Sequence, residues 1–293
     1  MADFILSAFS DEAADALSEQ IRALVENGIY QMEPRNINGK GILTLTDEEL
    51  YAMKGELDAS GVNVYSLGSP IGKYPIEEPF APHFEQFRRA LEICKILGAQ
   101  NMRMFSFFVK EEEREKYRDE VMLRMQKMLT LAKEYGVRLC HENESSIYGQ
   151  IPAEVEDLCN TLPELSLIFD GANYRMHDAD CAEGIRVTLK RLAYLHIKDA
   201  IFATKTIVAA GEGEANIPEV LRLVDEATDA RITLTLEPHL ALFTAYKSID
   251  KHELAGKERF STMREAFDYA VSALKKILID LGFKEGDMGV WKK

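Results

Sequence analysis

Two patterns of hydrophobic and polar positions alternate along the chain. Short apolar runs of the kind that form β-strands occur at eight places, residues 4–9, 29–33, 62–67, 101–107, 137–142, 165–170, 193–198 and 232–237. Between these runs, apolar residues recur every three or four positions, which is typical of helices with one buried face. The pattern therefore predicts a repeated alternation of strand and helix.

Residues that start and stop helices mark several boundaries. Asp11 is expected to cap a helix that ends at Asn27-Gly28. Thr46 and Glu49 have the spacing of a capping box, and Gly61 closes the helix that follows. The other helices are predicted before Gly98, from Lys110 to Tyr135, and at 152–161, 179–191, 217–228 and 262–281.

This alternation predicts the fold class. No stretch rich in Gly, Ser or Pro and no shift in composition divides the chain, so we expect a single domain over residues 1–293, folded as one closed (β/α)8 TIM barrel. A doubly wound sheet is the weaker alternative. It favours a glycine-rich turn after the first strand, and residues 10–16, SDEAADA, contain no glycine.

Composition and charge narrow the class of partner. The 293 residues carry a formal charge of −14, which disfavours a nucleic-acid backbone or an anionic membrane as a partner and leaves room for a small anionic substrate. The four cysteines form no CxxC pair, and the N-terminal sequence lacks the pattern of a signal peptide. These features predict a soluble cytoplasmic protein with structural thiols.

Candidate chemistry lies where the last four strands end, which is the catalytic end of a TIM barrel. The fifth strand ends in Glu142, the sixth in Asp170 and the eighth in Glu237, and the seventh carries His196. Side chains alternate between the two faces of a strand, so these four are expected to point into the barrel while apolar neighbours such as Leu195 face the helices.

Four inward side chains on adjacent strands, about 4.8 Å apart, can surround one ion. Three carboxylates and one imidazole form a hard, mostly oxygen ligand set, which suits Mn²⁺, Mg²⁺ or Co²⁺ better than a structural zinc and leaves catalytic Zn²⁺ open. Taken singly, each carboxylate has the plainer interpretation of a helix cap, and the histidine that of a hydrogen-bonded core residue. The set of four predicts a metal site.

The same positions match known motifs. The matching residues are Glu142-Asn143, Asp170 with Asn173, His196 with Lys198 and Asp199, Glu237, the segments GEGEANIPEVL (211–221) and SPIGK (69–73), and RMFSF (103–107). In these motifs the chain resembles the xylose isomerase-like superfamily, in particular the sugar phosphate isomerase/epimerase group, which includes ketose 3-epimerases and inosose dehydratases. One position departs, because many ketose 3-epimerases carry histidine where this chain has Asn173.

The resemblance implies an activity and a cofactor. It implies a metal-dependent isomerase or epimerase of a sugar, a sugar phosphate or a polyol-derived ketone, acting by proton abstraction next to a carbonyl and a metal-stabilised enediolate. One divalent ion, Mn²⁺ first, would be held by Glu142, Asp170, His196 and Glu237, with the two glutamates also serving as base and acid. The residues expected to bind substrate are Lys198, Asn173, Glu33, Lys73, Arg103 and His239.

Several of these residues have a second interpretation. Lys198 can form an ion pair with Glu142 or Glu237, and Glu33 can pair with Arg35. Asp199 has the opposite parity to Lys198 and is expected to orient the following loop. The segment 240–260 is long for a loop of this fold, and it can either close over the substrate or form a surface excursion.

Other functions remain in competition. A dehydratase using the same metal would lose a β-hydroxyl after the proton abstraction. An abasic-site endonuclease shares the barrel but needs more histidine ligands on the early strands and a basic face, which this chain lacks. A sugar-binding barrel without catalysis is disfavoured because both glutamates are present. The sequence leaves open whether the protein is a monomer or a homo-oligomer.

Overall fold

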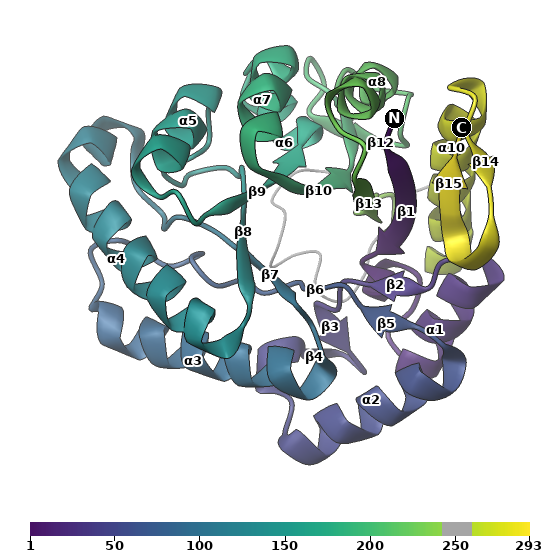
Figure 1. The fold of residues 1–293 in the computed structure, drawn as a ribbon, viewed down its shortest axis with the longest axis horizontal. Helices are drawn as coiled ribbons and strands as arrows, with labels where there is room; N and C mark the ends of the chain where they lie inside the picture. The colour runs from purple at the N-terminus through teal and green to yellow at the C-terminus, as the bar shows by residue number, and fades with distance from the viewer. Residues whose placement is uncertain (242–259) are drawn as a thin grey trace.

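The eight predicted apolar runs form the strands of a nearly closed parallel barrel in the computed structural model, which describes residues 1–241 and 260–293 (Figure 1). The barrel strands are β1 (Asp3–Ala8), β2 (Gln31–Met32), β5 (Asn63–Val64), β6 (Ser66–Leu67), β7 (Asn101–Met104), β8 (Arg138–Glu142), β9 (Ser166–Asp170), β10 (Leu192–Ile197) and β13 (Arg231–Leu236). The third run is divided at Tyr65, and its halves pair on opposite sides, β5 with β2 and β6 with β7. The predicted TIM-barrel class is confirmed.

Helices surround this barrel (Figure 1). They are α1 (Leu17–Glu26), α2 (Asp47–Ser60), α3 (Phe80–Leu97), α4 (Arg114–Tyr135), α5 (Pro152–Thr161), α6 (Gly171–Met176), α7 (Cys181–Thr188), α8 (Ile217–Ala227) and α10 (Met263–Asp280). The capping box of Thr46 and Glu49 is present, and Gly61 ends α2 in the left-handed conformation that glycine adopts without steric cost. The predicted helix at 179–191 is α7 followed by a separate 3-10 turn.

The predicted role of Asp11 as a helix cap is wrong. Residues Ser10–Glu12 form a 3-10 turn after β1, and α1 begins only at Leu17, with Ala16 in the cap position. The Asp11 side chain is buried and accepts two hydrogen bonds from Arg35. A buried guanidinium needs a charged partner, and this need outweighs the capping preference of the aspartate.

Short strands that the pattern did not predict accompany the barrel strands, as two separate hairpins and as a C-terminal hairpin that joins the barrel sheet through β1. They are β3 (Asn36–Ile37) with β4 (Lys40–Gly41), β11 (Asp199–Ile201) with β12 (Thr206–Val208), and β14 (Lys284–Glu285) with β15 (Val290–Lys292). β13 pairs with β1 along its whole length, so β15 and β2 share the other edge, next to the first and second halves of β1 respectively. The two ends of the chain therefore lie side by side (Figure 1).

The strand register confirms the predicted parity. His196 lies opposite Asp170 on β9 and Thr235 on β13, whereas Leu195 lies opposite Phe169 and Leu234. The inner residues Cys140, Ile168, Ala193 and Tyr194 form a small apolar cluster of their own, and the outer residues join the large core under the helices. Inside the barrel, the polar side chains at the C-terminal strand ends therefore lie next to a layer of apolar side chains.

Two sequence features bear on the surroundings of the barrel. Within the described residues, no helix combines the length and the apolar character that crossing a membrane requires. The predicted long loop at 240–260 lies almost entirely outside the described residues, since the structure describes nothing between 242 and 259.

Candidate metal centre and active site

The four predicted ligands meet at the C-terminal end of the barrel. One donor atom from each of Glu142, Asp170, His196 and Glu237 lies within 4.8 Å of the other three, and all four side chains are buried. They come from β8, β9 and β10 and from the residue after β13, which are neighbours in the sheet. Parallel strands bring their carboxyl ends to one edge, so positions far apart in sequence form one cluster.

His196 is oriented by Glu33. The Nε2 atom of His196 lies 3.3 Å from Glu33 Oε2, and the Tyr194 hydroxyl donates to Glu33 Oε1 at 2.8 Å. Glu33 is fully buried, and among the described residues its ion-pair contact is with His196 rather than with Arg35, the partner predicted as its alternative. A carboxylate behind a histidine ring is the usual second partner of a metal-binding imidazole, because it leaves the other nitrogen facing the metal.

The charge on His196 follows from these neighbours. Burial alone lowers the pKa of a histidine, but the carboxylates of Glu142 and Glu33 outweigh it and raise the pKa of His196 to about 10. The Nδ1 atom lies 3.1 Å from Glu142 Oε1 and 3.5 Å from Glu237 Oε2. These surroundings favour positive charge at Nδ1, which a divalent cation would also supply.

Glu142 is held at both oxygens. Arg103 Nη1 donates to Oε2 at 3.2 Å, and Asn173 Nδ2 donates to Oε1 at 3.2 Å. Burial acts to raise the pKa of Glu142, but the positive charges of His196 and Arg103 lower it to about 2. The group therefore stays ionised despite its burial.

Glu237 has two different environments at its two oxygens. Oε1 accepts from Arg35 Nη1 at 3.0 Å and lies 3.6 Å from Arg103 Nη1, and Oε2 lies 3.4 Å from Lys198 Nζ. Burial opposes ionisation, but Lys198, His239 and the other cations hold the pKa of Glu237 well below its usual range. The ion pair of Lys198 with Glu237 is one of the two predicted alternatives for this lysine.

Asp170 is the member of the four-residue cluster with the weakest charge compensation. Lys198 Nζ lies 3.0 Å from Asp170 Oδ2, and Oδ1 accepts from the backbone of Asn173. Burial nevertheless raises the pKa of Asp170 to about 6, since the Lys198 charge offsets it only in part. The side-chain amide of Asn143 bonds the Asp170 backbone in both directions at 2.9 Å and fixes the end of β9.

The donor set fits a divalent cation. Asp170 Oδ2 and His196 Nδ1 are buried, and apart from their ion-pair contacts with Lys198 and Glu142 they make no hydrogen bond to any residue that the structure describes. They are two of the twelve buried side-chain atoms of this kind in the described residues, and these two belong to the four-residue cluster. Three carboxylates and one imidazole are the ligands that Mn²⁺, Mg²⁺, Co²⁺ or catalytic Zn²⁺ accept.

The remaining predicted substrate residues lie at different depths. Arg103 reaches both glutamates, and His239 Nε2 lies 3.5 Å from Glu237 Oε1. Lys73 instead pairs with Glu144 at 2.8 Å and lies over the Phe105 ring, on the loop after β6. The structure thus brings Arg103 and His239 to the cluster and places Lys73 in a neighbouring ion pair.

Sequence reasoning predicted Glu33 on the second strand but missed the residues after the first strand and the contact of Arg35 with Glu237. Phe9, Asp11 and Glu12 are buried around Arg35, and Arg35 in turn contacts Glu237. The available signal was two adjacent carboxylates directly after an apolar strand, at the end of the barrel where polar residues gather. Burial raises the pKa of Glu12 to about 7, although His239 and Arg35 partly oppose the shift.

Asp199 orients a loop, as predicted. Its carboxylate accepts hydrogen bonds from the backbone N–H groups of Ala200, Gly211, Gly213 and Ala215 at 2.8–3.1 Å. These contacts hold the segment that leads into α8 against the end of β10. Asp199 therefore organises the loop behind Lys198.

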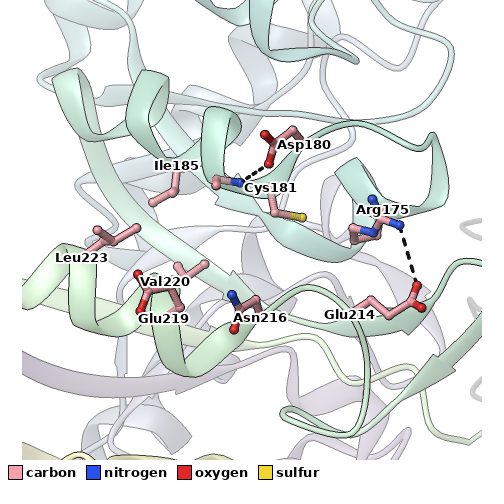
Figure 2. A pocket seen from close by; sticks show the side chains of 10 residues that line it. Arg175, Asp180, Cys181, Ile185, Glu214, Asn216, Glu219, Val220 and Leu223 are labelled. Atoms are coloured by element: carbon pink, nitrogen blue, oxygen red, sulfur yellow. Dashed lines mark hydrogen bonds and ion pairs between the residues drawn. The ribbon is translucent and has the colours of Figure 1, made fainter.

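Two of the cavities in the described part of the chain are lined by residues outside the cluster. One of about 360 Å³ lies between α7 and α8, lined by Asp180, Cys181 and Asn216, with the Arg175–Glu214 ion pair at its rim (Figure 2). The other, of about 610 Å³, is lined by the loops that follow β6, β7 and β8 and by His177. Neither is lined by a member of the four-residue cluster.

Comparisons with known proteins agree with the architecture. The profile of the xylose isomerase-like TIM barrel family matches residues 21–275. A search of curated proteins found no match. Similar solved structures include the IolI protein with a bound zinc atom, with a TM-score of 0.74 and 14% identity over 93% of this chain and 97% of that chain.

Two further solved structures have names that state a reaction. The probable 3-DHS dehydratase AsbF from Bacillus anthracis has a TM-score of 0.70 and 12% identity, covering 94% of this chain and 99% of that chain. The 3-keto-D-glucoside 4-epimerase YcjR from E. coli has a TM-score of 0.67 and 13% identity, covering 94% and 100%. At such identities the similarity establishes the fold.

Proposed function

The chain belongs to the xylose isomerase-like TIM barrel family, and on that basis we propose that it is a divalent-metal-dependent isomerase or epimerase. Its substrate would be a sugar, a sugar phosphate or a polyol-derived ketone. The observation that carries this proposal is the buried cluster of Glu142, Asp170, His196 and Glu237, whose donor atoms lie within 4.8 Å of one another. A similar fold in YcjR, named as an epimerase, supports the reaction class.

The two glutamates are the proton-transfer groups in this proposal. One takes the proton from the carbon next to the substrate carbonyl, and the electron pair of that bond moves onto the carbonyl oxygen to give an enediolate. Return of a proton to carbon completes an isomerisation or an epimerisation. Glu142 and Glu237 are ionised and flank His196, so either carboxylate can begin the cycle as the base.

A divalent cation, when bound, would supply positive charge that stabilises the oxygens of the enediolate. The chain adds donors of its own around the cluster. Lys198 Nζ has three N–H bonds, and the ammonium lies near both Asp170 and Glu237, where it can also donate to a substrate oxygen. Asn173 and Arg103 hold Glu142 while presenting further N–H groups at the same end of the barrel.

Metal analysis tests the first half of the proposal. Purified protein is expected to contain about one divalent ion per chain. We expect Mn²⁺ before other ions because the donor set is mostly oxygen, and Zn²⁺ next because the similar IolI structure holds a zinc atom. Glu142→Gln is expected to lose most of this metal. Glu144→Gln is the matched control, because Glu144 lies two residues further on and pairs with Lys73. A wild-type protein that takes up no divalent ion would refute the metal function.

Hydrogen exchange tests the second half. Incubation of the metal-loaded protein in D2O with a panel of ketoses and ketose phosphates is expected to introduce deuterium next to the carbonyl. Glu142→Gln should slow this exchange by about 10²- to 10⁴-fold, which is the usual contribution of a general base. Loss of water from a substrate would instead favour the dehydratase alternative. The similar fold of AsbF, named as a probable dehydratase, supports that alternative. No reaction with any member of the panel would count against both.

A further inference from the structure

Arg35 connects the ends of three barrel strands. It follows β2, and its side chain is 6% exposed. Its guanidinium donates to Glu237 Oε1 at 3.0 Å and to both oxygens of Asp11 at 3.0 Å each, and it lies 4.5 Å from the centre of the Phe9 ring. Asp11 and Phe9 belong to the turn after β1, and Glu237 follows β13.

We propose that Arg35 is a positioning residue for the metal centre, which holds Glu237 so that Oε2 faces the other ligands. This inference rests on the proposed function and adds to it a residue outside the four ligands. Oε1 faces Arg35 and Arg103, and Oε2 faces Lys198 and His196 Nδ1. The two oxygens of Glu237 are therefore not equivalent.

A carboxylate needs such a partner because its last torsion angle is broad and leaves its oxygens free to exchange places. A guanidinium restricts that rotation through directed N–H bonds, and a lysine ammonium does so far less well. Arg35 can impose the orientation because its own position is fixed by Asp11 on one side and by the Phe9 ring on the other.

The Asp11 anchor is itself supported. Asn36 Nδ2 donates to Asp11 Oδ2 at 2.8 Å, and Arg35 Nη2 also reaches Glu12 Oε1 at 3.2 Å. The turn after β1 therefore positions Asp11, Asp11 positions Arg35, and Arg35 positions Glu237. Replacing the Arg35 guanidinium should let the Glu237 carboxylate rotate, while all four proposed ligands stay in the chain.

The test compares Arg35→Lys with Arg114→Lys. Arg114 is the matched control because it is buried to a similar degree, with 10% of its side chain exposed, and donates to Glu154 and Gln150 at 3.0 Å, outside the cluster. Titration of the purified full-length proteins with Mn²⁺ is followed by calorimetry. Arg35→Lys is expected to raise the Kd about 10- to 100-fold, as loss of a partner behind a metal ligand commonly does.

Arg114→Lys is expected to leave the Kd within about twofold of wild type, since it lies outside the cluster. Melting curves show whether both variants are folded. A folded Arg35→Lys protein that binds Mn²⁺ as tightly as wild type would overturn the inference. If Arg35→Lys does not fold, Asp11→Asn replaces it. That variant keeps Arg35 and weakens its anchor, and it should raise the Kd in the same direction by a smaller factor.

Crystal structures of wild type and Arg35→Lys give a readout that does not depend on the metal. The Glu237 carboxylate is expected to turn away from His196 and Lys198 in the variant. An unchanged Glu237 would refute the role of Arg35 even if wild type bound no Mn²⁺, a result that would refute the metal function separately. A turned Glu237 in a protein without metal affinity would keep the positioning role and reject the proposed function.

Discussion

At the scale of single residues, the two proposed catalytic glutamates are held in the same way. One oxygen of each faces His196 Nδ1, at 3.1 Å for Glu142 and 3.5 Å for Glu237. The other oxygen of each accepts from a buried arginine, Arg103 for Glu142 and Arg35 for Glu237. Carboxylates held from both sides lose little orientational freedom when a cation binds, so the cluster is organised in advance.

Gly72 shows how tightly a single residue is confined near this end of the barrel. Its φ is +91°, and a Cβ built on it would lie 1.9 Å from the Phe105 carbonyl oxygen. We expect Gly72→Ala to lower the free energy of unfolding by about 3 kcal/mol or more, because strain and overlap add. Urea unfolding measures the change.

Gly39→Ala is the control for this prediction. Gly39 also has a positive φ, +73°, but no atom lies within 4 Å of its Cβ position. Its cost should be the backbone strain alone, about 1 kcal/mol. Equal losses in the two variants would show that the overlap with Phe105 is relieved by a small backbone shift.

At the scale of elements, the loop before α8 is held in place by one side chain, Asp199, which accepts several backbone hydrogen bonds. Asp199→Ala should therefore cost about 3 kcal/mol or more, since it leaves the N–H groups of Gly211, Gly213 and Ala215 without their acceptor. Asp180→Ala removes one such bond, at the start of α7, and should cost about 1 kcal/mol. Urea unfolding of both variants checks the order, and an Asp199→Ala loss no larger than that of Asp180→Ala contradicts it.

Helix α3 contributes a pH-dependent contact. His83 Nε2 accepts from the Gly72 N–H at 2.9 Å, and the ring stacks on Tyr74. Burial, together with the nearby Arg124 charge, lowers the pKa of His83, although Gln86 partly opposes this shift. The neutral ring is thus the form that the folded protein prefers.

The sign of the effect follows from that preference. Above the unfolded pKa of about 6.5 the contact contributes its full stability, and as the pH falls below this value the unfolded chain binds a proton that the folded chain resists. Wild type should therefore lose more unfolding free energy than His83→Gln between about pH 7.5 and about pH 5.5. Parallel pH profiles of the two proteins would refute the prediction.

At the scale of the whole molecule, the last residues of the chain join the barrel sheet. β15 pairs with the first half of β1, with Trp291 opposite Phe4, and Trp291 is buried. Lys293 pairs with Asp225 at 2.5 Å and so connects this end to α8. We infer that the C-terminal strands unfold together with the barrel.

Trp291 reports on this directly because the sequence contains one tryptophan. Its fluorescence and the far-UV circular dichroism should give the same urea midpoint, as in a cooperative transition. Trp291→Phe keeps an aromatic ring and should remove the fluorescence change, which confirms its source. A fluorescence midpoint at lower urea than the dichroism midpoint would mean that β15 detaches first.

Much of the barrel and of the ligand cluster could be read from local pattern. Alternation places Glu142 and His196 on the inner face of their strands, and parallel strands end at one edge, so two local rules suffice to group the four predicted ligands. The hairpin at Asn38-Gly39 also had a local signal, since both residues adopt positive φ in a two-residue turn that favours this dipeptide.

The sequence by itself thus determined the parity and the order of the strands, because side-chain alternation and strand succession are properties of neighbouring residues. Only the tertiary structure decided the partners of Arg35. Its contacts with Asp11 and Glu237 join residues 24 and 202 positions apart, and they exist because β1 pairs with both β2 and β13 when the barrel closes. A buried charge takes whichever opposite charge the closed fold brings within reach, and no local pattern encodes that choice.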